Sequence, residues 1–142
     1  SALRAVIAPH AEGRAFFSQV LTSGGHRFSM EMVSTGKADI SAIDPVSFAL
    51  AKRYVPELCA TLKVIGTSPD APGLPYVTHK NVSDKRVEQL RRGLNRAIRE
   101  PEFADIRKTL FIADVQVVEA QAYDRILEIE QAAVVLGYPN VA

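Results

Sequence analysis

Residue types suited to holding a small anion gather just after residues 18–22. The chain there reads Ser23-Gly24-Gly25-His26-Arg27, and no carboxylate occurs between Ser23 and Ser29. If a helix begins at His26, its first backbone N–H groups have no intrahelical partner and carry partial positive charge. The glycines let a ligand approach these amides, while the imidazole and the guanidinium add hydrogen-bond donors and charge. The combination predicts an oxyanion site at a helix start.

The same residues have a simpler interpretation, a glycine turn followed by a surface histidine and a solvated arginine. A carboxylate further along bears on the choice. Asp44 precedes Pro45, and Asp at the N-cap with Pro at the first helical position is a common helix start. Capping alone would account for Asp44. A cap would also place the carboxylate at the mouth of the site, where it could accept a hydrogen bond from a protonated or N–H-bearing ligand.

The elements that position these residues are predicted as two successive strand–turn–helix units. Strands are expected at 18–22 and 38–43, and helices at 26–35 and 45–54, with Gly36 ending the first helix. Such units indicate a parallel sheet, in which ligands lie beyond the carboxyl ends of the strands. Further extended runs are expected at 62–66, 74–79 and 112–118. The predicted fold class is therefore α/β, with a parallel-type sheet flanked by helices.

The remaining chain predicts helices and one stiff connection. A short helix at 2–8 is expected to be interrupted by Pro9, and a long one begins at Ser83. A shorter amphipathic helix follows Pro101, and a last helix spans 120–136. Its apolar stripe comprises Ala122, Ile126, Ile129, Ala133 and Leu136. The loop 67–79 contains three prolines and is interpreted as a hinge or cleft rim. Residues 1–79 would form one lobe, and 80–142 a C-terminal helical segment packing on it.

Composition and missing motifs narrow the function classes. A net charge of +1 gives no reason to expect nucleic acid, and no apolar run is long enough to cross a bilayer. The single Cys59 lies in an apolar setting, and the three histidines are scattered, so neither a metal site nor a cofactor is expected. Ser29 or Ser47 could form a triad with His26 and Asp44, but no nucleophile elbow is present. A small serine hydrolase is therefore an alternative, and a non-enzymatic binding protein is preferred.

Three segments carry a resemblance to a known family. The run T-S-G-G-H-R-x-S followed by V-x-x-G-x-A-D-I-x-A-I-D is similar to the second lobe of phosphonate/phosphate/phosphite-type periplasmic binding proteins of ABC importers. The later P-x-x-P-G-L-P-Y-V-T and the closing Y-D-x-I-x-x-x-E-x-A-x-x-x-G-Y-P also resemble this family. The similarity extends over nearly the whole chain. One departure is Gly24-Gly25-His26, where the family commonly has Gly-Ser-His, so a hydroxyl donor is replaced.

The resemblance implies a two-lobed binding protein of which this chain is the C-terminal portion. His26 and the amides around Gly25 would hold the anion, and Asp44 would face the same cleft. Arg27 and Ser68 are placed there by position alone. The implied partners are a small oxyanion and a membrane permease, and the implied location is periplasmic or otherwise extracytoplasmic. The effector-sensing domain of a transcription regulator is an alternative with the same architecture. A chain lacking half of the cleft is also expected to bind weakly and to self-associate.

Overall fold

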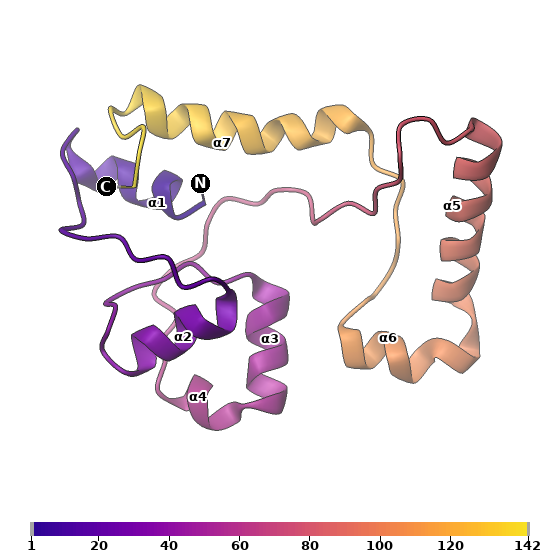
Figure 1. Cartoon of the computed structure of the whole chain (residues 1–142), viewed down its shortest axis with the longest axis horizontal. Coiled ribbons are helices and arrows are strands. Elements are labelled where there is room, and N and C mark those ends of the chain that lie inside the picture. Colours follow the sequence, from indigo (N-terminus) through magenta and orange to yellow (C-terminus); the bar gives the residue numbers. More distant parts are fainter. Residues whose placement is uncertain (1, 142) are drawn as a thin grey trace. The chain divides into compact units, whose positions relative to one another are not determined.

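The computed structural model describes residues 2–141 and shows helices joined by extended segments (Figure 1). In chain order the elements are α1 (Ala2–Ala11), α2 (His26–Ser34), α3 (Pro45–Tyr54), α4 (Pro56–Ala60), α5 (Asp84–Arg99), the 3-10 turn η1 (Pro101–Phe103), α6 (Ala104–Leu110), the 3-10 turn η2 (Ala120–Tyr123) and α7 (Asp124–Val135). They form two compact units. The first comprises the chain up to Pro72 together with the part from Tyr123 onward, and the second is Gly73–Ala122.

The predicted α/β class is wrong, because residues 2–141 contain helices and no strand. The expected strands at 18–22, 38–43, 62–66 and 112–118 are non-helical segments without ladder hydrogen bonds, and so is the run 74–79. Local sequence pattern indicates an extended backbone, but a strand exists only when its N–H and C=O groups pair with a neighbouring chain. β-propensity mostly measures packing against such neighbours, so it does not by itself create the pairing.

Three of these extended runs nevertheless come together in the first unit. Residues Phe16, Phe17, Ser18 and Gln19, then Asp39 and Ile40, and then Ile65 line one open cavity of about 490 Å³ with Ile7 of α1. The rings of Phe16 and Phe17 meet edge to face, with centroids 5.1 Å apart. The prediction of three extended segments is therefore correct, and the three lie near one another, but the predicted sheet does not form.

The helices α2 and α3 are confirmed close to their predicted bounds, because local signals fix both ends. Beyond α2, Gly36 has φ 70° and its N–H donates to Val33 O, while Lys37 N–H donates to Met32 O. These two bonds are the Schellman arrangement, which satisfies carbonyls at the helix end. α3 begins at Pro45 after the Asp44 cap, as the Asp-Pro pair predicts.

Pro9 does not interrupt the first helix as predicted, since α1 continues through it to Ala11. A proline inside a helix removes one hydrogen bond and crowds the preceding turn. Here the residues on either side are held by packing, because Ile7, Ala8 and Ala11 are all buried. Tertiary contact of this helix outweighs the local cost of the proline.

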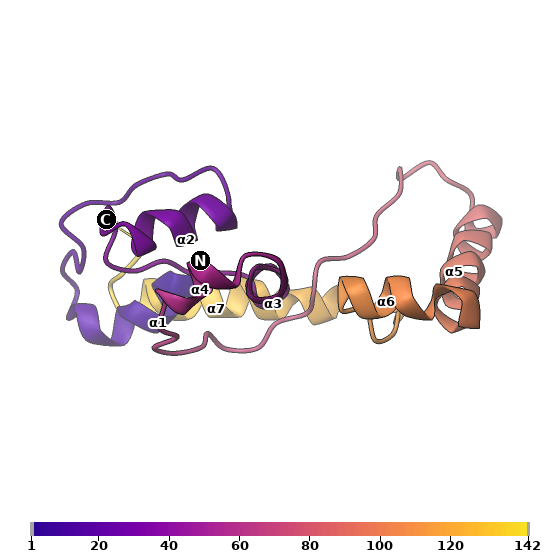
Figure 2. The ribbon, with the colours of Figure 1, turned by 90° about the horizontal axis from the view of Figure 1, so that it is seen from below.

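The core of the first unit lies between α1 and α7, which run side by side (Figure 1, Figure 2). Its buried members are Ile7, Ala8, Ala11, Ala133 and Tyr138, with Leu3 and Phe17 packed against them. Small residues on both helices let the two backbones approach closely. Of the stripe predicted on the last helix, Ile129 and Ala133 are buried, whereas Leu136 is 49% exposed.

A second Schellman arrangement turns the chain from α7 back into this core. Gly137 has φ 75°, its N–H donates to Val134 O, and Tyr138 N–H donates to Ala133 O. The left-handed backbone at this position is accessible to glycine at little cost. The turn places Tyr138, only 3% exposed, against the face of α7 that carries Ala133.

Replacing Gly137 with alanine is expected to lower the free energy of unfolding by about 1–2 kcal/mol, since a side chain is strained at this φ. The new Cβ would lie 3.5 Å from Gly13 Cα, an ordinary van der Waals contact, so the cost comes from the backbone conformation. Urea denaturation measures the loss. Gly66→Ala is the matched control, because nothing lies within 4 Å of its added Cβ and its φ is not positive. Equal stability of the two variants would contradict the role assigned to the turn.

The second unit is built on α5, η1 and α6. Arg107 of α6 donates to the Glu100 carbonyl oxygen at 2.7 Å, which ties α6 to the end of α5. The apolar stripe of α5 is only partly covered, with Leu90 42% and Leu94 36% exposed. None of the helices formed by residues 2–141 has both the length and the apolar character required to cross a lipid bilayer.

Candidate functional site

The start of α2 has the open backbone groups that the sequence predicts. Gly25 is the N-cap, no side chain caps the turn, and the first turn holds no acidic residue. Gly25, His26 and Arg27 are all exposed. The first N–H groups of a helix have no carbonyl within the helix to accept their hydrogen bonds. This end of α2 therefore presents donors and the positive end of a helix dipole to solvent.

Two serine hydroxyls, neither of them named as an anion ligand above, lie beside this turn. Ser23 Oγ is 2.6 Å from Ser29 Oγ, one helical turn inside α2. The same Ser23 Oγ accepts a hydrogen bond from Gly25 N–H at 3.3 Å. Position 25 lacks a hydroxyl, but the hydroxyls of Ser23 and Ser29 lie close to the same helix start. The sequence signal was the presence of serines on both sides of Gly24-Gly25, but six residues of separation gave no reason to pair them.

Asp44 caps α3, as predicted, and its Oδ2 accepts from Ser47 N–H at 2.7 Å. This backbone hydrogen bond is the main reason that the pKa of Asp44 lies below its ordinary value. Partial burial opposes the shift, while the Ser47 hydroxyl, the Val46 N–H and the charge of His26 favour it. The charge of His26 is the smallest of these causes. The α2 and α3 helices also contact one another.

The lowered pKa gives Asp44 a pH-dependent role in stability. The ionised carboxylate stabilises the folded chain above its unfolded-state pKa, and the contribution is lost as the pH falls through the lowered folded-state pKa. We expect Asp44→Ala to cost about 1 kcal/mol at neutral pH and much less in acid. Asp44→Asn, which still caps, should keep most of the stability and lose its pH dependence. Urea denaturation at a series of pH values checks both. A parallel pH profile for wild type and Asp44→Asn would contradict this account.

The other two predicted residues are placed differently. Arg27 Nε lies 3.0 Å from Glu31 Oε1 one turn along α2, and the two side chains are 67% and 42% exposed. Its guanidinium is thus already engaged along the helix surface. Ser68 is exposed in the extended segment after α4, and in the described part of the chain no hydrogen bond joins it to Gly25, His26 or Asp44. Gly25 and His26 lie at the start of α2 and Asp44 at the start of α3, whereas Ser68 lies in neither helix.

The described residues 2–141 hold neither a hydrogen-bonded catalytic triad nor a cluster of metal ligands. Ser29 pairs with Ser23, and Ser47 is bonded to Asp44, while no hydrogen bond connects His26 to either serine there. A nucleophile requires a base within hydrogen-bond reach, so this geometry does not favour the triad. No group of three His, Cys, Asp or Glu side chains in this part of the chain lies close enough to hold a metal ion.

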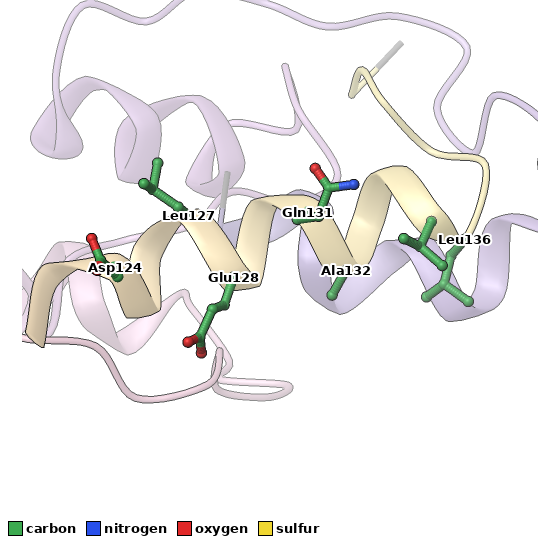
Figure 3. A pocket seen from close by; sticks show the side chains of 7 residues that line it. Asp124, Leu127, Glu128, Gln131, Ala132 and Leu136 are labelled. Carbon is green, nitrogen blue, oxygen red and sulfur yellow. The ribbon is translucent and has the colours of Figure 1, made fainter. Parts of the chain in front are cut away.

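Two cavities of the first unit lie away from the predicted anion site. One is the cavity of about 490 Å³ lined by Ile7 of α1 and by three extended segments. The other is an open groove along α7, drawn in Figure 3, whose labelled residues come from that helix and from Leu136 directly after it. It is lined by Asp124, Leu127, Glu128, Gln131, Ala132, Val135 and Leu136. Neither cavity is lined by Gly25, His26, Arg27, Asp44 or Ser68.

Comparison with known proteins gives one positive result. Residues 4–123 match the model of a family described as "ABC transporter, phosphonate, periplasmic substrate-binding protein". The matched range contains α2, the Asp44 cap and the whole second unit. No curated protein and no solved structure matches the chain.

Proposed function

The chain belongs to the phosphonate-type periplasmic substrate-binding proteins of ABC transporters, and from this premise we propose that it binds a small oxyanion. The ligand would be a small phosphonate, phosphate or phosphite. The protein would bind it outside the cytoplasm and deliver it to a membrane permease. A binding protein of an importer is preferred to the sensing domain of a transcription regulator, because the matched family is a transport family. It is preferred to a hydrolase because His26 makes no hydrogen bond to Ser29 or Ser47 in the described chain.

The observation that carries this proposal is the uncapped and exposed start of α2. Unpaired N–H groups and the positive end of the helix dipole favour a bound anion. His26 stands at the first helical position, and the hydroxyls of Ser23 and Ser29 lie in the same turn. The imidazole can donate a hydrogen bond to an oxyanion, and so can the one hydroxyl of the serine pair that does not donate to the other. In this proposal Gly25 and His26 make the main contacts, while Arg27 and Ser68 add contacts only after the side chains move.

The charge of Asp44 narrows the kinds of ligand that the site is expected to bind. A carboxylate with a lowered pKa is ionised at neutral pH and accepts hydrogen bonds without donating any. Beside an anion site it repels a fully deprotonated oxyanion and attracts a ligand that carries an acidic proton or an ammonium group. We therefore expect a hydrogen phosphonate, phosphite or aminophosphonate to bind more tightly than sulfate, which carries no proton at neutral pH.

Release and capture would depend on a hinge at residues 67–79. The division between the two compact units falls between Pro72 and Gly73, inside this loop. Prolines restrict the backbone, so Pro69, Pro72 and Pro75 would confine bending to the few residues between them. Domain closure about such a connection is one established way in which ligand binding changes a protein's shape. The permease would then recognise the closed form.

Calorimetric titration of the protein with phosphite, phosphate and several phosphonates tests the proposal. We expect His26→Ala to weaken binding about tenfold or more, because a hydrogen bond from a charged or polarised donor contributes roughly 1.5–3 kcal/mol. His10→Ala is the matched control, since His10 is exposed at the end of α1, and it should leave the affinity unchanged. Binding of no oxyanion by the wild-type protein would overturn the function. Binding that His26→Ala leaves intact would overturn only the site.

A further inference from the structure

We draw no further inference here: the strongest candidate, the exposed apolar groove along α7 lined by Leu127, Ala132, Val135 and Leu136 together with Asp124 and Glu128, is an unpartnered helix face, and nothing in the described residues shows what covers it.

Discussion

Replacing Tyr138 with alanine is expected to lower the free energy of unfolding by about 3 kcal/mol, the cost typical of deleting a buried aromatic ring. Tyr138 is 3% exposed and belongs to the core cluster that joins α1 to α7. Its hydroxyl also donates a hydrogen bond to the Val141 carbonyl oxygen. Removal of the ring leaves a cavity at the point where the chain turns back after α7. Urea denaturation followed by far-UV circular dichroism measures the loss.

Two further tyrosine variants separate the contributions. Tyr138→Phe retains the ring and removes only the hydroxyl, so we expect a cost of about 1 kcal/mol. Tyr54→Ala removes a ring that is 60% exposed at the end of α3, and it should change stability far less than Tyr138→Ala. If Tyr54→Ala and Tyr138→Ala destabilised the protein equally, the core between α1 and α7 would not be the stabilising element that we describe.

The second large effect is expected for Arg4→Ala, which should cost about 2–3 kcal/mol. The Arg4 side chain is only 14% exposed, and its NH2 group lies 3.3 Å from Glu130 Oε1. The guanidinium also donates to the carbonyl oxygens of Glu130 and Pro139. One side chain of α1 therefore connects to α7 and to the segment that follows it. The alanine variant would leave these carbonyl groups without their charged donor.

Arg14→Ala is the matched control for Arg4→Ala. Arg14 pairs with Glu12 at 3.0 Å, but both side chains are at least 75% exposed. Exposed ion pairs contribute little because water and salt screen them, so we expect a change below about 0.5 kcal/mol. Chemical denaturation of both variants at moderate salt gives the comparison. A loss in Arg14→Ala as large as that in Arg4→Ala would show that burial does not distinguish the two arginines.

The candidate site was partly predictable because its central residues depend on local rules. A glycine before His26 and the absence of nearby carboxylates were enough to predict an uncapped helix start, and Asp44 was predicted as a cap. That Asp44 faces the same site as His26 was expected from its place as a cap and from the resemblance, and the small charge effect of His26 on the pKa of Asp44 is consistent with that expectation. Arg27 was placed at the site by position alone, and its contact with Glu31 depends on which of several rotamers the guanidinium adopts.

What the sequence determined by itself is where most of the helices begin and end. Caps, glycines with positive φ and prolines at first helical positions act over a few residues, so Gly36 and Asp44-Pro45 could be interpreted without knowledge of the fold. Only the tertiary structure decided whether the extended runs would form a sheet and which face of α7 would be buried. Both outcomes depend on segments far apart in the chain. Strand pairing needs a partner backbone, and burial needs an opposing surface, here the Ile7 and Ala8 face of α1.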